Sequence, residues 1–222
     1  MPTLAAAALI ALTVSLGRWQ LNRAEEKGAR QALLDSRQGD MPLQLTGSVP
    51  SAEPMLYRRV RVAGEWVAIG QVFVDNQMHG GRAGFHVITP LRIRGSDAAV
   101  LVNRGWIARG REYPLAPAVE VPEGHVHVSG MVSLPPARFL ELSPQGIAGN
   151  VFQNLSIDRY REARRLDVLP FVVLADTPAP GLAAVRETPR MGVEKHREYA
   201  LTWFSLAATA FVLWIVMNLR RR

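Results

Sequence analysis

The sequence contains no cysteine among its 222 residues. Without thiols the chain forms no disulfide, so its fold does not depend on an oxidising compartment. The absence of any CxxC or CxxxC pair also excludes disulfide exchange and a thiolate copper site. The seven methionines are dispersed along the chain, so we expect no copper site built on thioethers either.

The motifs of several enzyme classes are missing as well. There is no nucleophile elbow, no phosphate-binding glycine loop and no paired-carboxylate motif. The glycines at positions 80, 81 and 84 do not follow the spacing of a dinucleotide-binding fingerprint. We therefore expect a protein that is not an enzyme.

Acidic residues are in deficit, with 19 Asp and Glu against 26 Lys and Arg, and the net charge is +7. Such a basic chain can indicate a nucleic-acid-binding protein. Here the arginines are scattered, and no basic helix or nucleic-acid-binding motif accompanies them. We predict no nucleic-acid partner.

An uncharged run of 21 residues spans positions 199–219 near the C-terminus. As a helix it would be about 32 Å long, which matches the roughly 30 Å hydrocarbon core of a bilayer. Trp203 and Trp214 lie toward its two ends, and basic residues flank it at 195–197 and 220–222. Aromatic rings and basic residues are typical of membrane interfaces, so we predict a transmembrane helix over 199–219.

A second apolar run covers positions 3–16. It is short for a crossing, and a signal peptide is the alternative interpretation. No Lys or Arg precedes the run, and the following GRWQLN is bulky and charged where a cleavage site needs small residues. We predict an uncleaved transmembrane helix over 3–21, with Arg18 snorkelling and Trp19 at the interface. Both ends of the chain then lie on one side of the membrane.

Charge alone does not decide which side that is. The arginines at 220–222 place the tails in the cytoplasm, whereas Arg18, Arg23 and Lys27 argue for the reverse. The positive-inside rule is weak for long loops, and the segment between the two helices is long. The composition leaves both orientations open.

The segment between the helices predicts a mainly antiparallel β domain of the α+β class. A connecting helix and an irregular stretch occupy 22–57, the β-rich domain 58–176 and a proline-rich linker 177–198. Alternation of apolar and polar residues predicts strands at 58–66, 71–76, 85–93, 100–106, 125–132 and 168–174. Prolines make 112–123 a loop. A short helix at 156–167 is expected to be capped by Asn154 or Ser156.

The core of this domain is expected to use its large aromatic residues. In the first strand Val60, Val62 and Trp66 share one face. The short helix is expected to turn residues 157, 160 and 163 inward. The aromatic core residues that we predict are Trp66, Phe73, Phe85, Trp106 and Phe171.

Four of the five histidines give no strong functional signal. His125 and His127 share a strand face and could hold a metal ion, but the sequence provides no third ligand, so an exposed polar face is the expected alternative. His86 is expected at the surface, and His79 in the glycine-rich turn that follows the second strand.

His196 is the exception, because it precedes the second apolar run at the membrane interface. On a helix it shares a face with Tyr199 and Trp203. An imidazole above an apolar helix face can ligate haem iron, and Arg197 or Lys195 could pair with haem propionates. The alternative is an interfacial anchor without chemical function, and the residues alone leave both open.

Six stretches together resemble the surfeit-locus (Surf/Shy) family of cytochrome c oxidase assembly factors. They occur in family order, with an apolar segment at each end of the chain, and cover nearly its full length. They are GRWQLNR at 17–23, RRVRVAGEW at 58–66, VFVDNQMHGGRAGFHVITPL at 72–91, VLVNRGWI at 100–107, NVFQNLSIDRY at 150–160 and EKHREYALTWFSLA at 194–207.

The resemblance implies a central domain in the periplasm, or in the mitochondrial intermembrane space, with both termini on the inner side of the membrane. The start of the chain is poor in Arg and Ser, unlike a mitochondrial transit peptide, so we expect the bacterial cytoplasmic membrane, with both termini in the cytoplasm. It implies haem a as cargo, with His196 as the matching axial ligand, and the haem-bearing oxidase subunit as partner. Haem a synthase is a further candidate partner, and membrane lipids surround the helices. The alternative is a cofactor-free scaffold that stabilises an oxidase subunit. The sequence assigns no role to Asn103 or Arg104.

Overall fold

The computed structural model describes residues 2–49, 51–135, 147–185 and 192–219. The chain separates into two units. The helical unit comprises Met1–Ser36 and Thr188–Arg222, and the β unit comprises Arg37–Glu187. The basic cluster predicted to close the C-terminal helix, at 220–222, lies outside the described residues.

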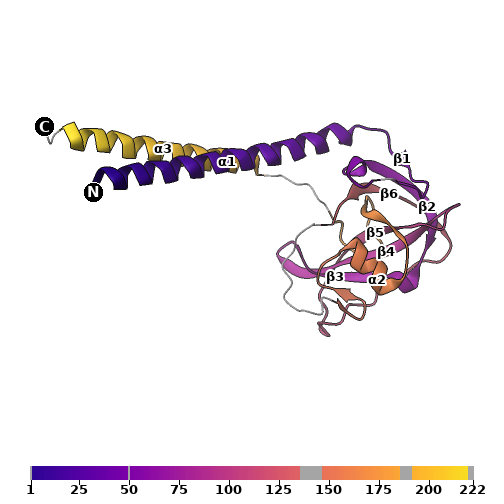
Figure 1. Cartoon of the computed structure of the whole chain (residues 1–222). Helices are drawn as coiled ribbons and strands as arrows, with labels where there is room; N and C mark the ends of the chain where they lie inside the picture. Colours follow the sequence, from indigo (N-terminus) through magenta and orange to yellow (C-terminus); the bar gives the residue numbers. More distant parts are fainter. Residues whose placement is uncertain (1, 50, 136–146, 186–191, 220–222) are drawn as a thin grey trace. The chain divides into compact units, whose positions relative to one another are not determined.

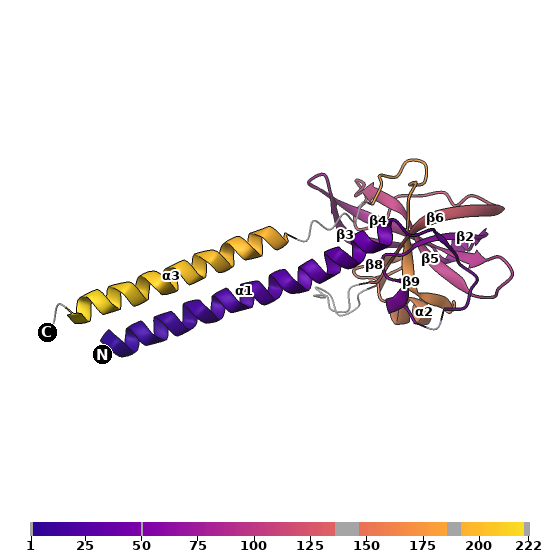
Figure 2. The same ribbon diagram turned by 90° about the horizontal axis from the view of Figure 1, so that it is seen from above.

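The helical unit consists of α1 (Pro2–Gln38) and α3 (Val193–Leu219). The two helices lie side by side and antiparallel, so the start of α1 and the end of α3 are at the same end of the pair (Figure 1, Figure 2). The predicted polar helix after the first apolar run is confirmed as a continuation of α1. Both helices are long and apolar enough to cross a membrane.

The β unit contains all six strands that the sequence predicts. They correspond to β2 (Arg59–Trp66), β3 (Val72–His79), β4 (Arg82–Ile93), β5 (Ala99–Ala108), β6 (His125–Ser133) and β9 (Val168–Ala175). Three two-residue strands complete the sheet: β1 (Leu43–Gln44), β7 (Ile147–Ala148) and β8 (Val151–Phe152). The helices are α2 (Ile157–Arg164) and the short 3₁₀ turns η1 (Glu53–Met55) and η2 (Ala68–Gly70). The stretch predicted as a loop, 112–123, is one.

The strands follow the order β1-β2-β6-β9-β5-β4-β3-β8-β7, and β2 also pairs with β4. The extra pairing closes β2, β6, β9, β5 and β4 into a ring. Three pairings are parallel, β1–β2, β3–β8 and β5–β9, so the sheet is mixed although most of its pairings are antiparallel. The ring closes where Gly64 faces Ile93, and a Cβ at Gly64 would overlap the Arg92 carbonyl oxygen.

The ring strands share one apolar core. Its strand members are Val60, Val62, Leu91, Ile93, Val100, Val102, Val132, Leu169, Phe171 and Val173, all nearly inaccessible to solvent. Because successive strand residues point to opposite faces, each strand contributes alternate residues to this core. The burial of Phe73, Phe85, Trp106 and Phe171 is confirmed. Trp66 is only partly buried, packed against the edge of the core.

A second apolar cluster includes α2. The Tyr160 ring is fully buried, and its hydroxyl donates to the Gly70 carbonyl at 2.7 Å. Burial raises the pKa of Tyr160 to about 12. The expectation that residue 163 turns inward is wrong, because Ala163 is exposed. Ser156 occupies the N-cap position, but its side chain makes no capping hydrogen bond.

Candidate functional site

His196 lies in the first turn of α3 and contacts α1. Its Nδ1 is 2.6 Å from Oε1 of Gln20. An amide oxygen accepts hydrogen bonds, so in this arrangement Nδ1 carries the proton and Nε2 keeps its lone pair. Histidines that bind metals characteristically donate the other ring N–H to a protein acceptor, which fixes the tautomer and the orientation of the ring. His196 therefore has the arrangement of a metal-ligating imidazole.

Basic side chains from both helices surround this histidine. Lys27 and Arg23 of α1 are close enough to act on His196 electrostatically. Arg23 is paired with Glu26 at 2.7 Å. On α3 both neighbours of His196, Lys195 and Arg197, are exposed. Cations of both helices thus lie near His196, together with the acidic residues Glu194 and Glu198 of α3.

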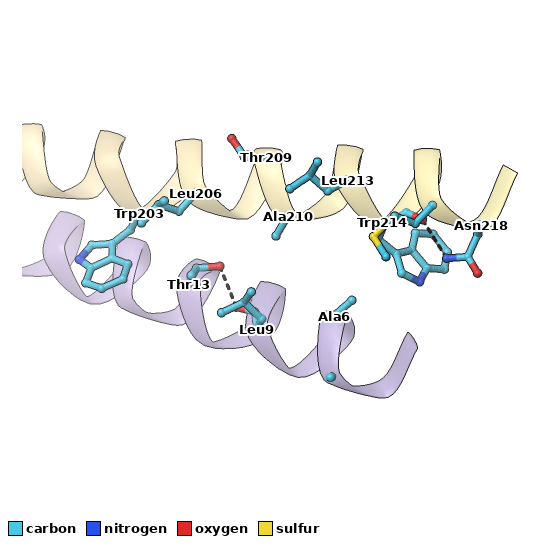
Figure 3. A pocket seen from close by; sticks show the side chains of 12 residues that line it. Ala6, Leu9, Thr13, Trp203, Leu206, Thr209, Ala210, Leu213, Trp214 and Asn218 are labelled. Atoms are coloured by element: carbon cyan, nitrogen blue, oxygen red, sulfur yellow. Dashed lines mark hydrogen bonds between the residues drawn. The ribbon is translucent and has the colours of Figure 1, made fainter. Parts of the chain in front are cut away.

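An apolar groove of about 580 Å³ runs between α1 and α3. Trp203 lines one end of it, while Trp214 and Asn218 line the other (Figure 3). The remaining lining residues are Ala5, Ala6, Leu9, Thr13, Leu206, Thr209, Ala210, Leu213 and Met217. Trp203, one of the predicted site residues, is therefore part of the groove wall. Tyr199, another, is not among its lining residues and is 57% exposed.

The polar groups that line the groove are mostly satisfied within their own helices. Thr13 donates to the Leu9 carbonyl at 2.9 Å, and Asn218 donates to the Trp214 carbonyl at 2.8 Å (Figure 3). Thr209 likewise donates to a carbonyl one turn earlier. The Trp214 indole N–H is buried without a partner in the described part of the chain. The groove accordingly offers an apolar ligand a wall with little competing polarity.

Small residues let the helices approach at the end of the groove nearer His196. A Cβ at Gly17 would lie 2.8 Å from the Phe204 ring, so only glycine leaves room for this contact. Ala200 and Ala207 are buried, as expected for positions of close helix packing. Ser205 and Ala208, which the sequence also suggests for this role, are exposed.

Two histidines of the β unit share an exposed face of β6. His125 pairs with Glu65 at 3.1 Å, and both His125 and His127 are exposed on β6. No group of three or more His, Asp or Glu residues with the spacing of a metal site occurs within the described ranges. The exposed polar face predicted for this pair is confirmed.

Two histidine predictions need correction. His79 is the last residue of β3 rather than part of the turn, and its ring lies 4.9 Å from the Trp106 ring. His86 is half-buried on β4 rather than at the surface. Desolvation by burial, with a smaller contribution from His79, lowers the pKa of His86 to about 4.

Comparison with known protein families covers nearly the whole chain. The SURF1 family model matches residues 7–208. The chain belongs to the SURF1 family. This family is generally linked to cytochrome c oxidase assembly, and the resemblance inferred from the six sequence stretches is confirmed.

Relatives in the SURF1 family come from bacteria and eukaryotes. A SURF1-like protein of Monosiga brevicollis is 26% identical over 93% of this chain and 84% of its own length. One from Rickettsia felis is 25% identical over 92% of this chain and 91% of its own. Surfeit locus protein 1 of Mus musculus is 26% identical over 95% of this chain and 74% of its own.

Sequence reasoning selected His196 and Trp203 as candidates but missed the residues of α1 that contact this part of α3. Gln20 and Gly17 belong to the GRWQLNR stretch, and their contacts bridge more than 170 positions of sequence. No local sequence pattern predicts a contact between residues so far apart in the chain. The available signal is that GRWQLNR and EKHREYALTWFSLA both belong to the resemblance, which indicates that the two stretches serve a common purpose.

Proposed function

We propose that this SURF1-family protein is an assembly factor for haem–copper cytochrome c oxidase that binds haem a and assists its insertion into the haem-bearing subunit. The observation that supports this most strongly is the pairing of His196 Nδ1 with Gln20, which leaves Nε2 free to ligate iron. The protein acts by binding and release rather than by catalysis. A single axial ligand in an accessible position suits a carrier that must give up its cargo.

The groove between α1 and α3 is suited to the isoprenoid tail of haem a. Such a tail gains free energy by leaving water for apolar surroundings. Trp203 lies seven residues after His196, which is about 10 Å along a helix, so ligand and groove follow one another along α3. His196 would hold the iron, and the groove that begins at Trp203 would hold the tail.

The basic residues near His196 suit the haem propionates. Arg197 and Lys195 of α3 are exposed, and Lys27 of α1 acts on the same histidine. Carboxylates that pair with exposed cations exchange readily with water, because surface ion pairs contribute only about 0–1 kcal/mol each. Propionates held in this way would not prevent release of the haem.

We further propose that the protein resides in the bacterial cytoplasmic membrane, with both termini in the cytoplasm and the β unit in the periplasm. The antiparallel arrangement of α1 and α3 supports a common side for the two termini (Figure 1). Its partners are then the haem-bearing oxidase subunit, with haem a synthase as the source of cargo, and membrane lipids around the helices.

The test is a visible spectrum of the full-length protein purified from cells that make haem a. The His196→Ala variant should lose the haem spectrum while the β unit stays folded. His125→Ala, on an exposed strand face, is the matched control and should retain the haem. A His196→Ala protein that keeps its haem would disprove the ligand assignment.

Gln20 offers a second, graded test. Gln20→Leu removes the acceptor of Nδ1–H, and loss of such a partner typically lowers metal affinity about 10–100-fold. Gln20→Glu restores an acceptor and should recover binding. Haem affinity measured by titration distinguishes these variants, and equal affinity in Gln20→Leu and the unaltered protein would contradict the role of Gln20.

A cofactor-free scaffold is the alternative, and exposed apolar side chains on the β unit favour it. Ile69, Met78, Tyr113 and Leu115 are 90%, 64%, 46% and 65% exposed. Large apolar residues in contact with solvent can form a partner surface. Pulldown of the haem-bearing subunit by the His196→Ala protein decides between the functions. Undiminished capture together with full oxidase activity in the cell would favour the scaffold.

A further inference from the structure

Arg104 of β5 is a buried cation that the proposed function does not use. The residue is only 4% exposed. Its Nη1 donates to Gln71 Oε1 at 3.0 Å and to Thr89 Oγ1 at 3.5 Å, and its Nη2 donates to the Glu120 carbonyl at 3.0 Å. All three acceptors are neutral. Gln71 and Thr89 are themselves joined by a hydrogen bond of 2.8 Å, so the acceptors form a fixed frame.

No carboxylate forms an ion pair with Arg104 in the part of the chain that the structure describes. None of the ion pairs found there includes Arg104. A buried charge without a counter-ion is costly, and burial lowers the pKa of the Arg104 guanidinium. An arginine nevertheless stays protonated, so the position retains a net positive charge inside the β unit.

A β-bulge explains why this side chain leaves the regular strand pattern. Val87 pairs with Gly105, but the next residue, Ile88, pairs with Asn103, so Arg104 is the extra residue on β5. Gly105 adopts a φ of +143°, and a Cβ there would lie 2.6 Å from Cβ of Leu182. Bulges commonly re-aim a side chain near a functional site.

Arg104 lines a pocket of about 340 Å³ within the β unit. The Trp66 ring forms part of the wall, with its centroid 5.2 Å from Arg104 Cζ. The segment after β9 contributes a further wall, because the Ala179 N–H donates to the Arg104 carbonyl at 2.8 Å. Val126, Val128 and Asp176 also line this pocket.

The guanidinium still has unused donors. An arginine offers five N–H groups, and the hydrogen bonds from Nη1 and Nη2 leave Nε–H and one Nη2–H without an acceptor among the described residues. Asp176, which lines the same pocket, is engaged by Arg59. Arg104 therefore brings a buried cation with unused donors to a pocket whose wall includes the Trp66 ring and the aliphatic residues Val126 and Val128.

We propose that this pocket is a binding site for a carboxylate that carries an adjoining apolar group, with the guanidinium of Arg104 as its anchor. A planar carboxylate matches the donor geometry of a guanidinium. A phosphate dianion suits the pocket less well, because a single arginine faces it and the Asp176 carboxylate adds negative charge. The apolar part of the ligand packs against Trp66, Val126 and Val128. The carboxylate belongs either to a small molecule or to an acidic side chain of a partner polypeptide.

Trp66 provides a direct probe of this site. The full-length protein in nanodiscs is labelled with 5-fluorotryptophan, and the Trp66 resonance is assigned in the ¹⁹F spectrum with the Trp66→Phe variant. Titration with 3-phenylpropionate should shift this resonance saturably, whereas the neutral isostere 3-phenylpropionamide should leave it unchanged. Absence of a saturable shift with 3-phenylpropionate would overturn the proposal, and so would an equal shift with the amide.

Substitutions test the anchor itself. Arg104→Lys retains the charge but loses the paired donors, so we expect affinity for 3-phenylpropionate to fall at least about tenfold. Arg104→Met should abolish the shift. Arg109→Lys, at the separate pair with Asp75, is the control and should bind normally. Normal binding by a folded Arg104→Met protein would also overturn the assignment. If Arg104→Met does not fold, the titrations of the unaltered protein with the acid and the amide still test the proposal.

Two further probes separate the sources of the carboxylate. Inorganic phosphate should bind more weakly than 3-phenylpropionate, and tighter binding would contradict the assignment to a carboxylate. The blocked peptide N-acetyl-Phe-Asp-amide represents an acidic side chain of a polypeptide, and its Asn counterpart is the neutral control. Tighter binding of the Asp peptide than of 3-phenylpropionate assigns the pocket to a partner protein, and the reverse order assigns it to a small molecule. Neither result depends on haem.

Discussion

The core of the strand ring and the groove between α1 and α3 are both apolar, yet only the ring core is filled. Side chains such as Leu91 and Phe171 have no exposed surface. In contrast, the groove-lining side chains Leu9, Leu206 and Leu213 are 51%, 49% and 56% exposed. Neighbouring strands cover the side chains of the ring core. No described part of the chain covers those of the groove in the same way.

The difference shows that the two units depend on different surroundings. The ring buries its own apolar surface, which contributes about 25 cal/mol for each Å² removed from water. The two helices leave most of their apolar surface exposed, so this surface needs an apolar solvent or a ligand to cover it. Substitutions should therefore act on the free energy of unfolding in the β unit and on helix association or ligand retention in the helical unit.

The largest effect is expected at the centre of the ring. Phe171→Ala leaves a cavity among fully buried side chains and should reduce the free energy of unfolding of the β unit by roughly 3–5 kcal/mol. Hydrogen exchange of the full-length protein in detergent measures this. Leu201→Ala on α3 is the control, and an equal effect of both substitutions on the β unit would break the contrast between the two regions.

The point of ring closure is the next most sensitive. Gly64→Ala introduces a Cβ that overlaps the Arg92 carbonyl oxygen, so β2 and β4 must move apart. We expect a loss of roughly 1–3 kcal/mol or more, seen as faster exchange of the amides at the β2–β4 pairing. Gly28→Ala on α1 meets no atom within 4 Å and should be neutral or slightly stabilising. Unchanged exchange in Gly64→Ala would show that the ring is not closed there.

Acid should weaken the β unit through His86. Between the ordinary pKa of 6.5 and the lowered pKa of about 4, the unfolded chain binds a proton that the folded chain does not. The free energy of unfolding should therefore fall as the pH drops through this window, by at most about 1.4 kcal/mol per pH unit.

The variant His86→Phe should flatten this dependence, measured by hydrogen exchange at pH 7.5 and pH 5. His127→Gln, on an exposed strand face, should preserve it. An unchanged slope in His86→Phe would assign the acid sensitivity to other groups.

The smallest effect is expected where the helices meet. Gly17→Leu would press on the Phe204 ring and separate α1 from α3, with a cost of about 1 kcal/mol, as for other helix contacts in membranes. Because the chain has no cysteine, spin labels on Leu21→Cys and Leu201→Cys report the interhelical distance cleanly. The distance should increase in Gly17→Leu but not in Gly28→Leu. An unaltered distance would show that Gly17 does not limit the approach.

The local features of the fold were predictable from sequence, because they depend on neighbouring residues. Alternation located Val60 and Val62 on one face of β2, and the length of the uncharged run located α3. Ring closure was not predictable, since no local sequence pattern around Gly64 predicts its pairing with Ile93 on another strand. The parallel pairing of β5 with β9 is of the same kind, because it joins strands about 70 positions apart in sequence.

In the candidate site, too, local features were predictable from sequence and long-range contacts were not. His196 and Trp203 could be selected as candidates because an ionisable ring next to an apolar helix is a local signal. Gln20 and the pocket around Arg104 were not identified, since they depend on a contact between two distant helices and on a bulge in β5. Trp66 was assigned to the core from its strand face alone. It lies instead at the edge of the core, where it forms part of the pocket wall.

The short outer strands of the sheet bear on how this protein avoids aggregation. In the described chain the sheet begins with β1 and ends with β7, each of only two residues. A long free edge offers unpaired N–H and C=O groups onto which another chain can add a strand. Along these two outermost strands such templating is limited to a few backbone groups, so they have little tendency to recruit another chain into intermolecular β-structure.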